Sequence, residues 1–395
     1  MIKVISIQQL VPGMYVTRIT QPKNRIKVTS TGLVKTIEAV GKLKDEGVLQ
    51  LEIDLTKSQL STQDTATTEH RDPVINRFSQ KMNQALDLYA QTKVTHSKII
   101  QRISKGKYAN LDDIEQISSH IIDNIFECEE IAGAVTQIRQ VDQYLLEHSV
   151  NCAILISLFA RHLNFDRPTI HQLGTAALLM DIGMAKLPLL LTQKRTSLND
   201  KETRQMQAHV DFALELVRLS GCVGDIGFEV IQQHHERLDG SGYPAGLAGE
   251  QISIYARMAA IVDTYDSLTA ERPYRQAMAP ADALRSMLDD KTIKMDPKLM
   301  DKFAECINLY PVGSVVKLQS GKLAMVLRAN PDSPLTPLVM SFYDIQNNCH
   351  EHVQKIDLSS SEDLIVSSIL PEDFNLNMLD FFKQAFDTTS TLTAP

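Results

Sequence analysis

Histidines and aspartates stand on apolar stretches in the middle of the chain, where polar side chains do not help to build a core. Six of them stand out by this placement: His148, Asp181, His209, His234, His235 and Asp263. An ionised carboxylate on an apolar helical face costs free energy unless it is paired or binds a cation. Imidazole and carboxylate groups together suit zinc, iron or manganese. The pattern alone leaves two interpretations open, a shared metal site or separate helix caps and buried hydrogen bonds.

The other seven histidines have no such context. They are His70, His96, His120, His162, His171, His350 and His352. We expect each of these imidazoles to be solvated or satisfied by a local hydrogen bond.

The spacing of apolar residues divides the chain into β-containing ends and a helical centre. Strand-like alternation near the N-terminus predicts a small α+β module, and a Ser/Thr-rich linker follows it. The spacing of Val74, Phe78 and Met82 predicts helices from there on, and strands return with a hairpin around Gln319-Ser320-Gly321. The fold class is therefore multidomain α+β, with an all-α bundle between two small β-containing pieces. The predicted ranges are 1–55 for the N-terminal module, 56–73 for the linker, 74–129 for connecting helices, 130–310 for the helical domain, 311–373 for a β extension and 374–395 for a tail.

Composition sets limits on the class of protein. With 395 residues the chain is long enough for two or three domains, and its net charge of −8 argues against a nucleic-acid polymer as partner. No apolar stretch is long enough for a membrane span, and the N-terminus lacks the features of a signal peptide. The five cysteines are scattered without CxxC spacing, which predicts reduced thiols. We therefore expect a cytoplasmic protein with no membrane partner.

Two stretches carry a resemblance to a known family. HHERLDGSGYP, residues 234–244, resembles the HHExxDGxGYP signature of the HD-GYP family, a helical subset of the HD-superfamily metal phosphohydrolases. RMAAIVDTYDSLTAERPYR, residues 257–275, is similar to the second signature of that family. The first 55 residues, with LVPGMYV and LEID, resemble a small module often fused to such domains, and the hairpin after residue 313 resembles their usual C-terminal extension.

The resemblance implies hydrolysis of cyclic di-GMP, a bacterial second messenger, at a cluster of one or two divalent metal ions. Iron or manganese is the expected metal, with zinc or nickel as alternatives. By the family pattern Asp181 bridges two metals. The first metal would also take His148 and Asp263, and the second His209, His234 and His235.

The same resemblance implies a substrate site beside the metals. Tyr243 and Arg272 would act on the phosphate together with Asp181, while Gly242 and Arg275 would complete the binding surface. Gly240 and Gly242 let the backbone turn without a side-chain clash. Arginine suits phosphate because its planar fork donates two hydrogen bonds at once. The alternative is that both arginines are ordinary surface charges.

The sequence departs from the family at three positions. The His-Asp dyad that names the superfamily is Met180-Asp181 here, and the lysine three residues after that aspartate is Met184. A thioether is a poor ligand for these metals, so we expect the His148 site to be the weaker one. Lys186 could replace the lysine in part. Some members use a glutamate for a third metal where this chain has Tyr144, so no third metal is expected.

Three functions therefore stay open. The first is a cyclic di-GMP phosphodiesterase, slowed by Met180 and Met184. The second is a non-catalytic relative that binds the nucleotide or a signalling protein. The third is an HD-type phosphohydrolase acting on a mononucleotide, which the intact Gly-Tyr-Pro loop disfavours. The sequence is also compatible with a homodimer.

Overall fold

The computed structural model describes most of the chain from residue 73 onward and short parts before it. The described residues are 2–7, 10, 14–21, 32–34, 39–40, 42–43, 48, 50–54, 57, 73–107, 111–137, 144–272, 275–289, 294–374 and 376. The chain divides into two compact units, Met1–Arg77 with Gln384–Pro395, and Phe78–Lys383.

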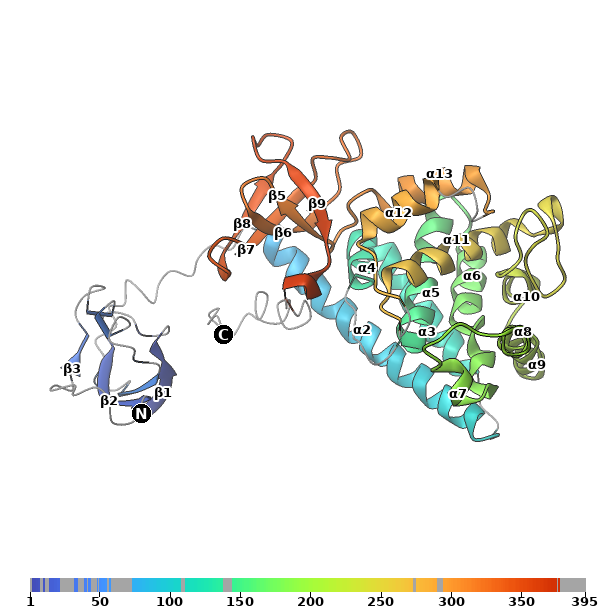
Figure 1. Ribbon diagram of the computed structural model, residues 1–395, viewed down its shortest axis with the longest axis horizontal. Coiled ribbons are helices and arrows are strands. Elements are labelled where there is room, and N and C mark those ends of the chain that lie inside the picture. Colours follow the sequence, from blue (N-terminus) through green and yellow to red (C-terminus); the bar gives the residue numbers. More distant parts are fainter. Residues whose placement is uncertain are drawn as a thin grey trace. The chain divides into compact units, whose positions relative to one another are not determined.

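The first unit contains a four-stranded antiparallel sheet (Figure 1). Its strands are β1 (Ile2–Ser6), β2 (Tyr15–Gln21), β3 (Gly32–Leu33) and β4 (Gln50–Asp54), in the order β1-β4-β2-β3. Leu51 and Ile53 of β4 are fully buried because alternate residues of a strand point to the same face. Val16 and Val48 pack with them in a small core.

Helices make up the centre of the second unit (Figure 1). In chain order they are α2 (Pro73–Ser104), α3 (Asp112–Glu127), α4 (Glu129–Val135), α5 (Tyr144–His162), α6 (Arg167–Leu179), η2 (Ile182–Lys186), α7 (Leu189–Thr192), α8 (Asp200–Gln207), α9 (His209–Ser220), α10 (Asp225–Gln233), η3 (Gly249–Gln251), α11 (Ile254–Thr269), α12 (Pro280–Asp289) and α13 (Pro297–Ile307). Helices α5, α6 and α11 are buried over most of their surface, since apolar residues lie all round them. These three helices form the core of the bundle and position three of the six predicted ligands, His148, Asp181 and Asp263.

A second sheet follows the helices. It consists of β5 (Val315–Leu318), β6 (Lys322–Arg328), β7 (Leu338–Asp344), β8 (Cys349–Asp357) and β9 (Ile365–Ile369), all antiparallel in the order β8-β7-β6-β5-β9, and η4 (Pro371–Phe374) ends it. The predicted hairpin joins β5 to β6, and Gly321 takes the left-handed conformation (φ 82°) that its turn requires. Sequence analysis did not predict β8 and β9.

The expected fold class, multidomain α+β with a helical HD-type centre, is confirmed. The predicted linker 56–73 and tail 374–395 lie almost wholly outside the described residues, so these boundaries stay predictions. None of the described helices is long and apolar enough to cross a membrane.

Candidate metal centre

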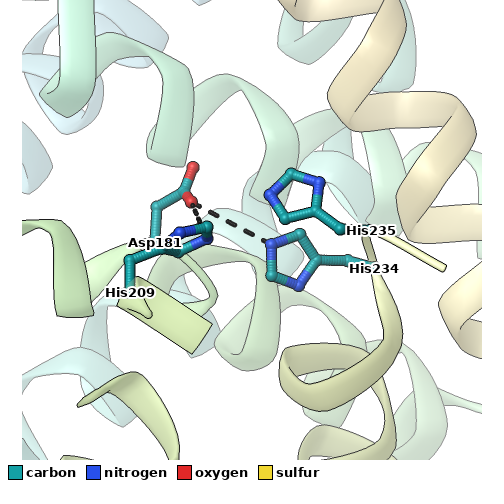
Figure 2. A group of neighbouring side chains, drawn as sticks. All are labelled: Asp181, His209, His234 and His235. Atoms are coloured by element: carbon teal, nitrogen blue, oxygen red, sulfur yellow. Dashed lines mark ion pairs between the residues drawn. The ribbon is translucent and has the colours of Figure 1, made fainter. Parts of the chain in front are cut away.

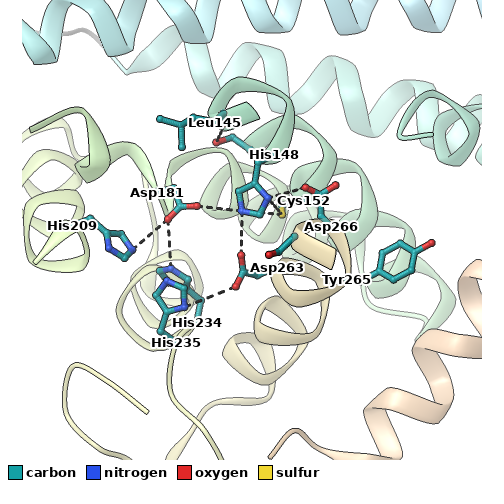
Figure 3. A network of polar contacts seen from close by, with 12 residues as sticks. Leu145, His148, Cys152, Asp181, His209, His234, His235, Asp263, Tyr265 and Asp266 are labelled. Carbon is teal, nitrogen blue, oxygen red and sulfur yellow. Dashed lines mark hydrogen bonds and ion pairs between the residues drawn. The ribbon is translucent and has the colours of Figure 1, made fainter. Parts of the chain in front are cut away.

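The six predicted ligands come together from five parts of the helical bundle (Figures 2 and 3). His148 lies on α5, Asp181 directly after α6, His209 at the start of α9, His234 and His235 directly after α10, and Asp263 on α11. One cluster consists of Asp181 with His209, His234 and His235, and the other of Asp181 with His148 and Asp263. Within each cluster the ligand atoms lie within 4.8 Å of one another, and Asp181 belongs to both.

Asp181 is the centre of this arrangement. Its Oδ2 lies 3.2 Å from His148 Nε2, and its Oδ1 lies 3.3 Å from His209 Nε2 and 4.0 Å from His234 Nε2. Asp263 completes the second cluster, with Oδ1 3.1 Å from His148 Nε2 and Oδ2 3.8 Å from His235 Nδ1. A carboxylate shared by two groups of candidate ligands, three histidines on one side and His148 with Asp263 on the other, suits a bridging ligand.

A glycine allows the chain to bring Asp181 against His209. Gly183, two residues after Asp181, packs so tightly on α9 that an added Cβ would lie 1.9 Å from the His209 carbonyl oxygen and 2.7 Å from Ala213 N. Real Cβ atoms never approach backbone this closely, so any other residue would push η2 away from α9. The short distance from Asp181 to His209 therefore depends on Gly183.

Hydrogen bonds fix which nitrogen of two imidazoles carries the proton. His209 Nδ1 lies 2.7 Å from the Met206 carbonyl oxygen, and His234 Nδ1 lies 3.0 Å from that of Ile231. A carbonyl only accepts, so each Nδ1 donates, and in the neutral form of the ring each Nε2 then keeps a bare lone pair. Both Nε2 atoms are buried without a hydrogen bond. They face the Asp181 carboxylate, which is also an acceptor, and a cation between them is the partner that fits.

His148 is oriented by a residue that sequence analysis missed. Asp266 is fully buried, and its Oδ2 accepts a hydrogen bond from His148 Nδ1 at 2.7 Å. This bond directs His148 Nε2 toward Asp181 and Asp263, as Figure 3 shows. A carboxylate behind a histidine ligand both fixes the ring and makes the imidazole a better ligand. The only signal in the sequence is that Asp266 follows Asp263 by three residues, about one helical turn.

Burial and neighbouring charges set the ionisation of the cluster. Burial lowers the pKa of His234, and burial together with the neighbouring His234 lowers the pKa of His235 well below its usual value. Burial alone would raise the pKa values of Asp181 and Asp263, but contact with His148 outweighs it and both stay well below the usual range. Neutral rings on His234 and His235 beside the ionised carboxylates of Asp181 and Asp263 are ligand forms that a divalent cation binds.

The Gly-Tyr-Pro loop is closed by an acid of the same motif. Glu236 is buried, and its two carboxylate oxygens accept hydrogen bonds from Ala245 N at 2.7 Å and Leu247 N at 3.0 Å. Gly242 passes so close to this turn that an added Cβ would lie 2.4 Å from Glu236 Cα. Tyr243 then packs on His235, with ring centroids 4.6 Å apart, and burial raises the pKa of its phenol. The loop thus places a protonated tyrosine with its ring beside the candidate ligands His235 and His209.

The two predicted phosphate-binding arginines lie just after α11. Two backbone hydrogen bonds join Arg272 and Arg275 to each other. The guanidinium of Arg275 donates to the Ser267 carbonyl oxygen in the last turn of α11. Arg275 therefore has a structural contact that the sequence did not indicate, and phosphate binding by either arginine stays a prediction.

The three departures from the family pattern have different settings. Met180 is 1% exposed and Met184 is half-buried. Lys186 Nζ pairs with Glu215 Oε2 at 2.7 Å and lies over the Phe212 ring, so its charge already has an acidic partner. The side chain of Tyr144 lies outside the described residues, and the expected absence of a third metal is untested.

Two buried residues near the cluster were not anticipated. Cys152 Sγ lies 3.8 Å from both ring nitrogens of His148, and burial raises the pKa of this thiol to about 12, so it is protonated at neutral pH. His96 is fully buried, and neither of its nitrogens has a hydrogen bond of normal geometry within the described residues, although the backbone of Leu178 lies close enough to interact with the ring. The expectation that His96 is solvated or locally bonded is therefore wrong, because its position on α2 faces the bundle.

Comparisons with known proteins agree with this geometry. Residues 135–299 match the family model of the HD domain, and residues 2–114 match that of a domain of unknown function, DUF3391. The chain is 36% identical over 250 residues to cyclic di-GMP phosphodiesterase PA4108 of Pseudomonas aeruginosa, covering 62% of this chain and 60% of that protein. It is 34% identical over 147 residues to the cyclic di-GMP phosphodiesterase response regulator RpfG of Xanthomonas campestris, covering 36% of this chain and 38% of that protein.

Two further matches come from other bacteria. The chain is 33% identical over 168 residues to 3'3'-cGAMP-specific phosphodiesterase 3 of Vibrio cholerae, covering 42% of this chain and 36% of that protein. A solved structure described as an HDG"Y"P protein from Bdellovibrio bacteriovorus has 17% identity and a TM-score of 0.48, covering 77% of this chain and 98% of that one. The chain spans less than two thirds of the length of the curated relatives named here.

Residues 135–299 form an HD domain, and all six candidate ligands lie within this range. The helical bundle and its ligand cluster therefore identify the class of protein as HD-domain proteins. HHERLDGSGYP and the curated relatives narrow this class further. Residues 135–299 form an HD domain of the HD-GYP type, with methionine in place of the histidine of the HD dyad.

Proposed function

We propose that this chain is a metal-dependent phosphodiesterase that hydrolyses cyclic di-GMP in the bacterial cytoplasm. The observation that carries the proposal is the pair of buried Nε2 atoms on His209 and His234, each with a bare lone pair directed at the Asp181 carboxylate. Acceptors that face one another in a buried site repel unless a cation lies between them. The names of the relatives supply the substrate class, a cyclic dinucleotide.

The proposed ligand sets are unequal. Asp181 with three histidines offers four ligands, while Asp181 with His148 and Asp263 offers three. Met180 adds no useful ligand to the smaller set, because thioether sulfur binds iron or manganese weakly. We therefore expect one tight and one weaker ion, with iron or manganese as the metal and zinc or nickel as alternatives. Bound divalent ions of this kind lower the pKa of a water ligand and offset charge on a phosphate.

Protein groups next to the cluster supply the proposed substrate contacts. The neutral hydroxyl of Tyr243 can donate a hydrogen bond to a phosphate oxygen, and its ring is held in place by packing on His235. Gly242 keeps the loop against the backbone of Glu236 and Arg237, where an added Cβ would clash, and so fixes the position of the neighbouring Tyr243. Arg272 is the proposed partner for the second phosphate oxygen, with Arg275 supporting the same turn.

A second candidate function is nucleotide binding with little or no hydrolysis. The observation that favours it is the pair of methionines, together with the pairing of Lys186, the proposed partial replacement for the lysine, with Glu215. Loss of one electrostatic contact of this type commonly lowers a rate by about 10²-fold or more. Under this candidate the nucleotide complex, or a signalling protein that recognises it, is the output. A homodimer stays a prediction for either function.

One set of measurements tests the proposal. The full-length protein is loaded with manganese or ferrous iron, its metal content is determined, and turnover of cyclic di-GMP and of 3'3'-cGAMP is followed in parallel. His209→Ala should abolish both metal retention and turnover, while His120→Ala, which changes an exposed histidine, should leave both unchanged. Metal binding and nucleotide binding without turnover would favour the second candidate. A protein that holds no metal under any condition would overturn the proposal.

A further inference from the structure

Helix α2 buries one continuous face along the helical bundle. The buried positions follow one another at steps of four and three residues, which is the 3.5-residue repeat of helices packed side by side. They are Phe78, Met82, Ala85, Tyr89, Thr92, His96, Ile99 and Ile103. The middle of this apolar face is polar, although an apolar residue would pack there at lower cost. These polar positions lie opposite the part of the bundle that holds the metal ligands.

Two polar bridges join this part of α2 to α5. The Tyr89 hydroxyl donates to Asn151 Oδ1 at 2.9 Å, and Lys93 Nζ donates to Glu147 Oε1 at 2.9 Å. The side chains of Lys93 and Glu147 are only 12% and 3% exposed, so the ion pair is largely shielded from water. Lys93 Nζ also lies 5.2 Å from the centroid of the Tyr89 ring, which links the two bridges.

The bridges enclose a predicted metal ligand. Glu147 directly precedes His148 on α5, and Asn151 follows it by three residues, so both flank the same helical turn. A buried carboxylate that loses its cation must move toward water or stay at high cost. Because Glu147 and His148 share a backbone, such a movement displaces the imidazole that faces Asp181 and Asp263.

The two helices that these bridges join match different family models. Helix α2 lies within residues 2–114, which match the domain of unknown function, whereas α5 lies within the HD match, residues 135–299. Two residues that flank the candidate ligand His148 in the HD domain, Glu147 and Asn151, are thus held by side chains from outside the range of that match.

We propose that Tyr89 and Lys93 are positioning residues for His148, through which the segment before the HD domain sets the affinity of the second metal cluster. The inference rests on the proposed metal centre. It makes α2 a functional part of the metal centre, although none of the six candidate ligands lies on α2. It also provides a route by which a change in α2 alters one cluster and leaves the other intact.

The experiment compares metal binding at the two clusters in the full-length protein. Mn²⁺ is titrated into Lys93→Met, and free Mn²⁺ is measured by electron paramagnetic resonance to give the number of sites and their dissociation constants. The weaker class of site, assigned to His148, Asp181 and Asp263, should lose at least about tenfold in affinity, as for other residues that orient a ligand. The tighter class should keep its affinity. Lys93→Arg, which keeps the charge, should restore binding close to that of the parent.

Further variants separate positioning from general loss of stability. Tyr89→Phe removes one hydroxyl and should weaken the same class of site by a smaller factor. Lys93→Met combined with Glu147→Gln removes both charges and should recover part of the loss. Lys302→Met breaks a comparable lysine–glutamate pair at the surface and should change nothing.

The outcomes distinguish this inference from the proposed function. A parent that binds no Mn²⁺ would overturn both. A parent with two classes of site, together with folded Lys93→Met and Tyr89→Phe proteins that bind both ions as tightly as the parent, would overturn the inference alone. An equal loss at both classes in either variant would also overturn it, since it would indicate destabilisation of the whole bundle.

Discussion

Replacing Asp266 with asparagine tests how the second cluster is built. The side chain keeps its shape but loses the negative charge that accepts a hydrogen bond from His148 Nδ1 at 2.7 Å. An asparagine amide can present either an oxygen or an NH₂ group to the ring. If it presents the NH₂ group, the imidazole proton moves to Nε2 and points at the ligand position. The variant therefore weakens the hold on His148 and also allows the wrong tautomer.

The size of the effect follows from burial and charge. Asp266 is fully buried, so water cannot replace the lost contact. A hydrogen bond to a charged group contributes about 1.5–3 kcal/mol. Loss of a residue that orients a metal ligand lowers affinity about 10–100-fold, which corresponds to about 1.4–2.8 kcal/mol. The two ranges agree, and we expect a loss of this size at the cluster of His148, Asp181 and Asp263 alone.

The assay is a Mn²⁺ titration of parent and Asp266→Asn, with thermal unfolding of the metal-free proteins as a check on folding. Asp282→Asn, at an exposed position on α12, serves as the matched control. Turnover of cyclic di-GMP at saturating Mn²⁺ should recover in part, because excess metal compensates for weaker binding. Unchanged affinity for both ions in a folded Asp266→Asn protein would refute the assignment of Asp266 as the residue that orients His148.

Three other predictions follow from the same structure. Met180→His combined with Met184→Lys should raise hydrolysis of cyclic di-GMP by about 10²-fold, and a parent that is already as fast would show that the methionines are tolerated. Gly183→Ala should lower the free energy of unfolding by about 1–3 kcal/mol and weaken metal binding, because its Cβ would meet the His209 carbonyl oxygen; a variant with the parent's melting temperature would contradict this. Burial lowers the pKa of His96 from 6.5 to about 4, so the unfolded chain binds a proton between these values that the folded one does not. The metal-free protein should therefore lose about 3 kcal/mol as pH falls from 6.5 to 4, and chemical denaturation should show His96→Leu without this part of the loss.

The candidate ligands could be predicted because each of them breaks a local pattern. Asp181 follows five apolar residues and His234 begins a signature, so both are visible without knowledge of the fold. Asp266 breaks no pattern of its own, and its partner His148 lies 118 residues away in the sequence. Its role depends on how α5 and α11 pack, which the sequence does not state. For the same reason Gly183 reads as an ordinary turn residue until α9 is placed against it.

The helices of the central bundle could also be predicted from the sequence. The face that α2 buries and the last strands of the C-terminal sheet could not. Apolar spacing showed where α2 begins but not which bundle face it covers. The sequence therefore predicts a solvated or locally hydrogen-bonded His96, whereas this residue belongs to the buried positions of α2, which follow one another at steps of four and three residues. Strands β8 and β9 escaped prediction because their polar residues do not give a clear alternation. Local patterns identify elements, and contacts between distant elements decide what each side chain does.

The two bridges from α2 determine how far this protein can be shortened and still fold. A fragment limited to residues 135–299 would keep every candidate ligand. It would also bury the Glu147 carboxylate without the Lys93 ammonium and expose to water the apolar surface that α2 covers. We expect such a fragment to aggregate or to lose metal, and one that begins at Pro73 to remain folded. The boundary of the sequence family and the boundary of the smallest stable piece are therefore different in this chain.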